Sequence, residues 1–484
     1  MPDRYTRLFE RHLFPLLDLA NRTTIAAKLE HLLASEHLPR DAIRRQQESD
    51  VARVVETTRR RSDFYRRLWD GQGQGPSSHF GPLDGLPVVT KGHLADAPGA
   101  FPLPDYRGKT VRCVTSGSTG RPMTFYRSGE QESWFWALRF RIWRWAGYHP
   151  GDKYLTINLN PRLGWKKKLQ DRLFRCAYLT FNADNQDSAR ILRALERRRI
   201  QHLNGFSSSL YVLAQFMLRE RREAPTVTGI TSTGDTLYPV YRQAVEDAFG
   251  ARVLDYYGAG GEGVHLASQS QESGDRYLLH PENGLVELLG PEGPVAPGEI
   301  GRIVVTQFHN DAMPLVRYEL GDLAVAAPDD AQCPSGRTLP MLERLEGRVP
   351  DLVVVPDGSF LVPHFFVVLF KGLQSIHRYQ IVQREEGRMT ARLVPHPGCP
   401  QGQVEDDIRA KVDEATRGLI ETDFDWVDDI PLTGAGKRRL VISDLSRRLV
   451  KKDGDRDASL GRGLGPGGGP GGGTAKGSDG RPSP

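Results

Sequence analysis

The sequence predicts an α/β protein with three parts: a large layered α/β domain over residues 1–347, a small α+β lid domain over 348–447, and a disordered tail over 448–484. Two observations lead to this prediction. Between about residues 150 and 257, short apolar runs of strand type alternate with helix-like segments, which is typical of α/β layers with a largely parallel sheet. After residue 450 there are 12 Gly and 4 Pro in 34 residues, too few apolar side chains to offset chain entropy.

The first part of the chain predicts helices and then a pair of strands. Residues 1–70 carry apolar side chains at helical spacing with many arginines, which we interpret as solvated helix faces; an anion site is the alternative. Thr90 can cap a short helix. The runs VRCVT (111–115) and TFYRS (124–128) have strand character and flank the segment TSGSTGRP.

A long helix is expected after these strands. Ser128 and Gln131 predict a capping box at its start, and Gly147 ends it. We interpret the aromatic face of this helix as core; the alternative is that it lines a substrate pocket. The residues of that face, at near-helical spacing, are Trp134, Leu138, Ile142 and Trp145.

Strands and helices then alternate to about residue 257. The expected strands are KYLTINLN, HLNGF, GITSTG and ARVLDYYG, and the expected helices cover about 186–199, 208–222 and 238–249. Strand-like segments dominate residues 276–327. Residues 351–447 mix both types, with helices near 362–373 and 403–420.

Composition and charge exclude several classes of protein. The net charge of +5, from 65 Lys+Arg against 60 Asp+Glu, is too small to predict nucleic-acid binding. No apolar run reaches the ~18 residues that span a bilayer, and the N-terminus does not resemble a signal peptide. The four cysteines lie far apart without a C-x-x-C pair, so we expect no disulfide framework, no zinc site and a cytoplasmic location.

The segment at residues 115–122 has the composition of an anion-binding loop. It combines hydroxyl side chains, two glycines and Arg121 between two strand-like runs. Glycines allow backbone N–H groups to approach an anion closely, while the hydroxyls and the guanidinium add donors and charge. The Walker A pattern is absent. We predict a polyphosphate loop; an ordinary hairpin turn is the alternative.

The spacing G-x-G-x-x-G occurs twice and is weak evidence in both places. Gly258, Gly260 and Gly263 follow a predicted strand, and a second match lies inside the tail. A dinucleotide site needs a helix after the glycines, whereas the residues after Gly263 are short and polar. A dinucleotide-binding oxidoreductase is therefore a lower-ranked alternative.

Five segments of the chain match, in order, the motifs of one enzyme superfamily. They are TSGSTGRP (115–122), STGDTL (232–237), DYYGAGGE (255–262), RYELGD (317–322), and LEGRVPDLVVVPDG (345–358) together with IPLTGAGKRRL (430–440). These segments resemble the adenylate-forming acyl- and aryl-CoA synthetases, most closely the phenylacetate–CoA ligase group with its capsule-biosynthesis relatives. The resemblance covers most of residues 50–445.

The resemblance implies an AMP-forming ligase that uses ATP, Mg²⁺ and CoA. A carboxylate attacks the α-phosphorus of ATP to give an acyl-adenylate and pyrophosphate, and a thiol then displaces AMP. Such chemistry needs positioned charge more than covalent catalysis. The expected partners are a small carboxylic acid, ATP, and CoA or an amine.

The resemblance also assigns roles to residues. The β- and γ-phosphates would lie against Ser116, Gly117, Ser118, Thr119, Gly120 and Arg121. The adenine would lie near Asp235, Tyr257 and Gly258, Mg²⁺ at Glu262, and the ribose at Asp322 and Arg348. Lys437 and Arg121 would be catalytic, with Lys437 bridging the carboxylate and the α-phosphate. Without the motifs, each residue has an ordinary structural explanation, such as a core aromatic for Tyr257 or a solvated basic loop for Lys437.

Four departures from the family pattern matter. Arg121 stands where lysine is usual, Asp235 where glutamate is commoner, and Glu262 falls one residue later than usual. Pro350 occupies the hinge position, where aspartate or lysine is usual, and a proline ring fixes φ. We therefore expect a restricted domain rotation with slow or altered thioester formation, unless Asp351 is the true hinge.

The identity of the acid cannot be predicted residue by residue. The segment LNGFSSSL (203–210) and the aromatic helix favour an aromatic or apolar acid. Three alternatives stay open besides transfer to CoA: the same adenylation with an amine acceptor, which Pro350 favours, the dinucleotide enzyme, and a non-catalytic paralogue that acts as a binding protein.

Overall fold

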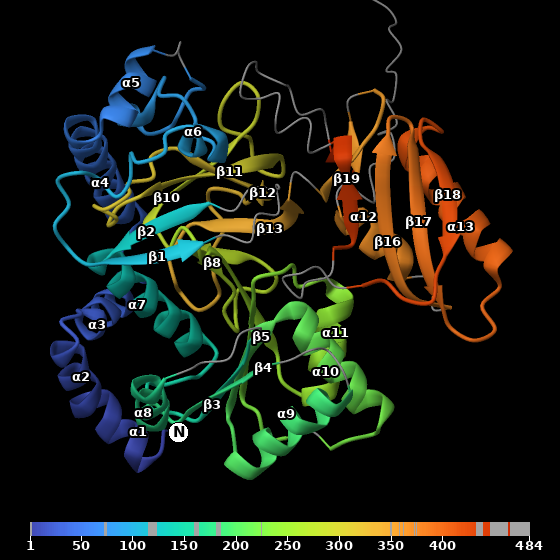
Figure 1. Cartoon of the computed structure of the whole chain (residues 1–484), viewed down its shortest axis with the longest axis horizontal. Helices are drawn as coiled ribbons and strands as arrows, with labels where there is room; N and C mark the ends of the chain where they lie inside the picture. Colours follow the sequence, from blue (N-terminus) through green and yellow to red (C-terminus); the bar gives the residue numbers. More distant parts are fainter. Residues whose placement is uncertain are drawn as a thin grey trace, which may run out of the picture.

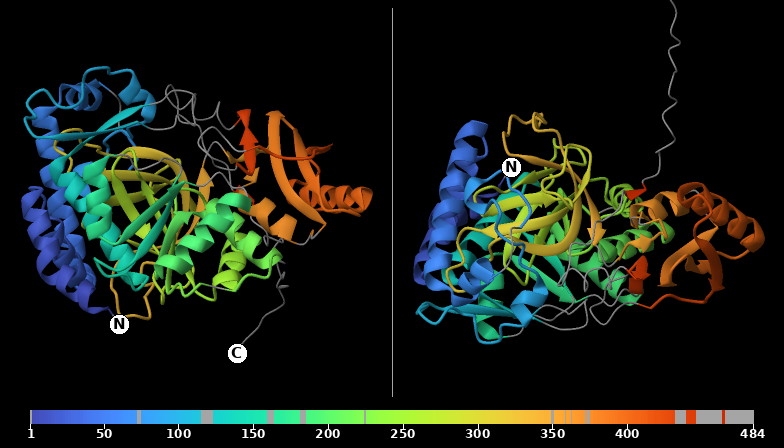
Figure 2. Two further views of the ribbon diagram at one scale, coloured as in Figure 1. Left: turned by 60° about the horizontal axis from the view of Figure 1, so that its bottom comes forward. Right: turned by 90° about the horizontal axis from the view of Figure 1, so that it is seen from above.

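The computed structural model describes residues 2–71, 75–114, 123–158, 164–180, 185–223, 225–348, 351–357, 359–361, 363–371, 373, 375–431, 439–445 and 463–464. Figure 1 and Figure 2 show a large α/β body with a smaller unit at one side, formed by the C-terminal elements. This arrangement matches the predicted fold class. The domain boundary at residue 347 stays a prediction.

Helices form the N-terminal part, as the apolar spacing predicts. They are α1 (Arg4–Leu8), the π-helical turn η1 (Phe9–Leu13), α2 (Phe14–Ala20), α3 (Ile25–Ser35), α4 (Arg40–Arg61), α5 (Asp63–Gly71), the 3-10 turn η2 (Gly81–Leu83) and α6 (Lys91–Ala95). The Thr90 side chain accepts a hydrogen bond from the His93 N–H, so the predicted cap of α6 is confirmed.

A hairpin precedes the central helix. Its elements are β1 (Thr110–Val114), β2 (Thr124–Ser128) and, after them, α7 (Gly129–Trp145). Ser128 caps α7 by accepting a hydrogen bond from the Gln131 N–H, as predicted. The second half of the predicted capping box is absent, because the Ser128 N–H donates to Asn310 Oδ1 and not to the Gln131 side chain. Asn310 lies 182 residues away and could not be read from local sequence.

The described residues form one large sheet in the order β10-β11-β12-β13-β9-β8-β7-β6-β5-β3-β4. Its strands are β3 (Tyr154–Asn158), β4 (Cys176–Thr180), β5 (His202–Phe206), β6 (Gly229–Thr233), β7 (Val253–Ala259), β8 (Val264–Ser268), β9 (Tyr277–Leu279), β10 (Gly284–Leu289), β11 (Ile300–Gln307), β12 (Tyr318–Ala326) and β13 (Met341–Arg348). The strands from β4 to β7 are parallel, and the others pair antiparallel. The predicted parallel region, and the strand-rich region after it, are both confirmed.

Helices cover both faces of the parallel strands. The covering helices after α7 are α8 (Trp165–Leu173), α9 (Asn185–Arg198), α10 (Ser207–Arg219) and α11 (Pro239–Phe249). Leu155 and Ile157 of β3 pack into a core with α9, α10 and α11. Tyr154 of the same strand packs with α7 on the opposite face. Because side chains alternate along a strand, every second residue of the parallel strands faces α7.

The glycines at 258–263 are not followed by a helix. β7 turns directly into β8, and the two strands pair antiparallel. A dinucleotide-binding turn needs a helix at this point. The fold therefore gives no support to the oxidoreductase alternative.

The C-terminal unit has its own core and its own sheet. Its elements are β14 (Val353–Val354), β15 (Phe360–Leu361), α12 (Pro363–Lys371), β16 (Ile376–Glu385), β17 (Arg388–Pro395), α13 (Gln401–Thr416), β18 (Glu421–Trp426) and β19 (Val441–Ser443). The four-stranded sheet has the order β18-β17-β16-β19. In the predicted disordered tail, β20 (Gly463–Leu464) pairs with β15. Strand pairing uses backbone groups that glycine also has, so this pairing gave no signal in the sequence.

The remaining structural expectations concern cysteines and membranes. All four cysteines are free thiols. Among the residues that the structure describes, no helix is both long enough and apolar enough to cross a membrane.

Candidate functional site

Two residues from distant parts of the chain meet beside the carboxyl ends of the parallel strands. The hydroxyl of Tyr257, near the end of β7, donates a 2.7 Å hydrogen bond to Asp322 Oδ2 in β12. Asp322 is paired in register with Arg348 across β12 and β13. These are the residues predicted for the adenine and the ribose, and the fold brings their backbones into one region.

A side chain is excluded at Gly258, the next residue of β7. A Cβ atom there would lie 2.3 Å from the carbonyl oxygen of Val264 and 3.0 Å from His265 Nδ1. The backbone of β7 therefore approaches β8 too closely for any other residue. Gly258 thus fixes the strand that carries Tyr257 against the strand that carries His265.

Glu262 lies in the turn between β7 and β8. Its backbone carbonyl accepts a 2.8 Å hydrogen bond from Gln307 Nε2, and the carbonyl of Gly263 accepts a 2.7 Å bond from Gln131 Nε2. Gly263 has φ +81°, a left-handed conformation that favours glycine. Two side-chain amides from other elements therefore hold the turn that carries the predicted metal ligand.

Tyr318, at the start of β12, is a buried tyrosine. Burial raises the pKa of Tyr318 well above its usual value, and the negative charges of Glu262 and Asp322 raise it further. No cluster of three or more His, Cys, Asp or Glu side chains is arranged to hold a metal ion within the described part of the chain.

Asp235 has a structural partner. Its two carboxylate oxygens accept hydrogen bonds from the N–H groups of Ser207 (2.6 Å) and Ser208 (3.2 Å), the first residues of α10. Negative charge at a helix N-terminus is favourable, and the bonds satisfy donors that would otherwise lack partners. The geometry therefore gives this carboxylate a role in holding α10, while contact with an adenine stays a prediction.

The remaining predicted site residues lie outside the described residues. They are Ser116, Gly117, Ser118, Thr119, Gly120, Arg121, Pro350, Lys437 and the side chain of Arg348. Asp351, which follows Pro350, accepts a 3.1 Å hydrogen bond from Arg439 Nε. Arg439 stands two residues after Lys437. This ion pair therefore ties Asp351, the alternative hinge residue, to the segment that follows the predicted catalytic lysine.

Sequence reasoning missed a layer of polar side chains between α7 and the sheet. Arg127, Arg139 and His265 all have buried side-chain nitrogen atoms without a hydrogen-bond partner. The available signal was two arginines, Arg139 and Arg141, inside the otherwise apolar and aromatic run FWALRFRIW (135–143) of α7. An arginine among so many buried aromatics is rarely placed there without a partner or a ligand.

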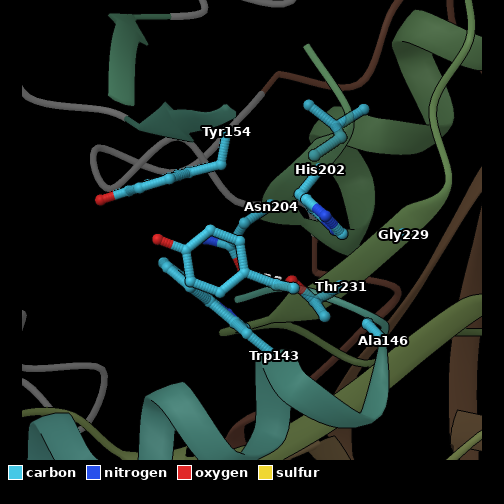
Figure 3. Close-up of a pocket in the computed structure, with 9 residues that line it drawn as sticks. Trp143, Ala146, Tyr154, His202, Asn204, Gly229 and Thr231 are labelled. Carbon is cyan, nitrogen blue, oxygen red and sulfur yellow. Dashed lines mark hydrogen bonds between the residues drawn. The ribbon is translucent and has the colours of Figure 1, made fainter. Parts of the chain in front are cut away.

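A pocket adjoins this layer (Figure 3). It is a small hollow, partly open to solvent, with room for about one water molecule. Trp143 Nε1 and the Tyr148 hydroxyl are buried there without a hydrogen-bond partner. The aromatic face predicted for this helix lies in the core, through Trp134, Leu138, Ile142 and Trp145. The pocket is lined instead by Trp143, which was not part of the predicted face. The other lining residues are Ala146, Tyr154, His202, Leu203, Asn204, Gly229 and Thr231.

Comparison with known sequences finds relatives over most of the chain. The family model of the CapK C-terminal domain matches residues 353–444. The phenylacetate-coenzyme A ligase of Thermus thermophilus is 25% identical over 370 residues, which are 73% of this chain and 81% of that protein. The protein CapK of Staphylococcus aureus is 21% identical over 399 residues, 80% of this chain and 86% of its own.

Comparison with solved structures supports the fold. A 2-hydroxyisobutyryl-CoA ligase in the postadenylation state, bound to an acyl-AMP, superposes with a TM-score of 0.66 at 18% identity. The match covers 87% of this chain and 93% of the ligase. The resemblance to adenylate-forming enzymes is thereby confirmed, both in sequence and in fold.

Proposed function

From the premise that this chain is a relative of the adenylate-forming CoA ligases, we propose that it is an AMP-forming ligase that activates a small carboxylic acid with ATP and passes the acyl group to CoA. In the first half-reaction, a carboxylate oxygen of the acid attacks the α-phosphorus and pyrophosphate leaves. In the second, the CoA thiolate attacks the acyl carbonyl and AMP leaves.

The hydrogen bond between Tyr257 and Asp322 is the observation that carries this proposal. It fixes an ionisable carboxyl group beside the strand end where the motif resemblance puts the ribose, and a carboxylate accepts well from two vicinal hydroxyls. Tyr257 and Asp322, 65 residues apart in sequence, therefore meet where one nucleotide could contact both.

The residues near the β7–β8 turn suit a magnesium ion bound together with ATP. Mg²⁺ commonly takes only one or two protein carboxylates and completes its shell with phosphate oxygens and water. Glu262 would supply that carboxylate, and the ion would neutralise charge on the phosphates. Lys437 and Arg121 are proposed, from their motifs alone, to neutralise charge around the α- and β/γ-phosphates.

The finer points of the proposal concern the acid, the acceptor and the location. Trp143 of α7, which lines the pocket, supports an aromatic or apolar component in the acid. Transfer to CoA follows from the phenylacetate-coenzyme A ligases among the relatives. We place the protein in the cytoplasm, where ATP and CoA are available and where four free cysteines would persist.

The test is ATP–pyrophosphate exchange across a panel of aryl and acyl acids. We expect exchange that depends on the acid and that Lys437→Ala abolishes, while Lys411→Ala, an exposed lysine of α13, leaves it unchanged. Exchange without added acid, or exchange that survives Lys437→Ala, would contradict adenylation. Adding CoA or amines to the responding acids then identifies the acceptor.

A further inference from the structure

We infer that the acid carries a second, anionic group and that Arg139 of α7 binds it. This inference rests on the proposed function and specifies its substrate class as dicarboxylic acids, whose backbone can include apolar or aromatic carbon. It departs from the purely apolar acid that the sequence favours. The reason lies in the side chains between α7 and the sheet.

The sheet face beneath α7 is polar. Thr156 of β3, Asn204 of β5 and Thr231 of β6 are neighbours in register and lie on that face. Asn204 Oδ1 accepts hydrogen bonds from the Thr231 hydroxyl (2.9 Å) and the Tyr256 hydroxyl (3.2 Å), while Thr156 Oγ1 is buried without a partner. Asn204 and Thr231 also line the pocket of Figure 3, and a pocket built only for an apolar group would not place polar groups on its floor, because each costs desolvation.

Arg139 is held rigidly but has no counter-charge. Its guanidinium carbon lies 5.1, 5.0 and 5.8 Å from the ring centroids of Phe135, Trp136 and Trp143. The side chain is half-buried, its Nε is buried without a partner, and it forms no ion pair with any described residue. Aromatic faces orient a guanidinium and partly strip its water, but they do not satisfy its five N–H donors.

The charges around Arg139 leave one positive charge unbalanced. Arg127 lies 3.2 Å from Glu132, so those two side chains compensate each other. His265 is buried, stacks on Phe135 at 4.2 Å, and has a pKa held well below its usual value by burial and by the two arginines, so it is neutral. Arg139 is therefore the cation that the described part of this layer leaves without a partner.

His265 adds hydrogen-bonding capacity to the same place. Both of its ring nitrogens are buried without a partner. A neutral imidazole offers one donor and one acceptor, and leaving buried hydrogen-bonding groups without partners is unfavourable. A carboxylate next to Arg139 would receive the imidazole N–H as well as the guanidinium N–H groups.

This layer adjoins the proposed adenylation site. His265 is paired with Gly258, the residue after Tyr257, so β8 carries the imidazole next to the strand that carries the nucleotide residues. Trp143 is shared between the Arg139 aromatic cluster and the pocket of Figure 3. On this inference, an acid whose first carboxylate lies near Tyr257 extends beneath α7 toward Arg139.

The experiment compares acids that differ only in a second carboxylate. Butyrate is compared with succinate, hexanoate with adipate, and benzoate with terephthalate, by ATP–pyrophosphate exchange with the full chain. We expect kcat/KM for one diacid to exceed that of its monoacid about 30-fold or more, the effect of a charge-assisted hydrogen bond. Arg139→Gln removes this preference through the KM for the diacid, with the monoacid and ATP values unchanged; Arg139→Lys restores part of it.

The outcomes separate this inference from the proposed function. Arg219→Gln, an exposed arginine of α10, is the control and leaves the preference intact. The inference is wrong if exchange is faster with the monoacids. It is also wrong if Arg139→Gln changes exchange equally for both acids of a pair. In either case the proposed adenylation activity still stands. An equal preference for neutral hydroxy acids also overturns the anionic class. Absence of exchange with every acid overturns the proposed function itself.

Discussion

Asp255 of β7 is a buried carboxyl group that accepts two hydroxyl hydrogen bonds, from Ser232 Oγ (2.5 Å) and from Tyr277 Oη (2.6 Å). Burial raises its pKa to about 6, compared with about 3.9 in an unfolded chain. Between these two values the folded protein holds a proton that the unfolded chain has lost. The free energy of unfolding contributed by this group therefore falls as the pH rises from about 4 to about 6.

We predict that Asp255→Asn removes this loss of stability. Relative to the variant, the free energy of unfolding of the wild type falls by about 2–3 kcal/mol between pH 4 and pH 7, because the two pKa values differ by about two units. Urea unfolding of both proteins across this range measures the difference. Asp275→Asn, at a largely exposed carboxylate, is the control and shows no such trend. A constant difference between wild type and Asp255→Asn would contradict the assigned pKa.

The bond between Tyr257 and Asp322 predicts coupled effects on nucleotide binding. Asp322→Asn loses the charge offered to the ribose and raises the KM for ATP about 30-fold, whereas Tyr257→Phe loses one hydrogen bond and raises it about fivefold. Because the two groups bond to each other, the KM for ATP of the double variant rises by less than the product of the two single-variant increases. Exchange kinetics measure all three. If the increase in KM for the double variant equals the product of the two single increases, the Tyr257–Asp322 bond does not contribute to nucleotide binding.

At the scale of elements, Asp235 determines how α10 begins. Asp235→Ala leaves the N–H groups of Ser207 and Ser208 without their acceptor and lowers the free energy of unfolding by about 1–2 kcal/mol. Asp247→Ala, at an exposed position of α11, serves as the control in urea unfolding. We expect the KM for ATP to stay within about twofold, since a cap acts on the helix. A large rise in the KM for ATP without loss of stability would instead support the predicted contact between Asp235 and the adenine.

Most elements with a buried face were predictable, whereas helix α8 and the partly buried strand β4 were not. The periodicity of α10 and α11 and the apolar runs of β5, β6 and β7 gave these elements in the right order. Helix α8 was not expected, because its large apolar residues Trp165 and Leu169 are 71% and 53% exposed. A helix that buries little presents no regular apolar face for sequence reasoning to find.

The sequence motifs identified residues of the candidate site, but they did not predict which of those residues contact one another. Tyr257 and Asp322 are 65 residues apart, and only the sheet order brings them together. His265 gave no signal, because a lone histidine in a strand is usually part of the core. Arg139 was visible within an aromatic helix, yet its lack of a counter-charge depends on which residues the fold places around it.

At the scale of the whole molecule, the predicted domain junction includes residues 349 and 350. Arg348 ends β13 in the large sheet, and Asp351 is bound to Arg439 in the C-terminal unit, so both neighbours of the junction are held. A proline ring fixes φ near −65° and also restricts the residue before it. Any reorientation of the small unit about this junction therefore has fewer free torsions than an aspartate would give.

We predict that Pro350→Asp increases the rate of CoA thioester formation relative to adenylation roughly tenfold, equivalent to about 1.4 kcal/mol in barrier height. Pyrophosphate release and thioester formation, followed in single-turnover experiments with one responding acid, give the two rates. Pro356→Asp, in the turn after β14, changes the same residue type away from the junction and leaves the ratio unchanged. An unchanged ratio in Pro350→Asp would show that the torsion at this proline does not limit the second half-reaction, and the slow step would then lie in the chemistry at the acyl carbonyl.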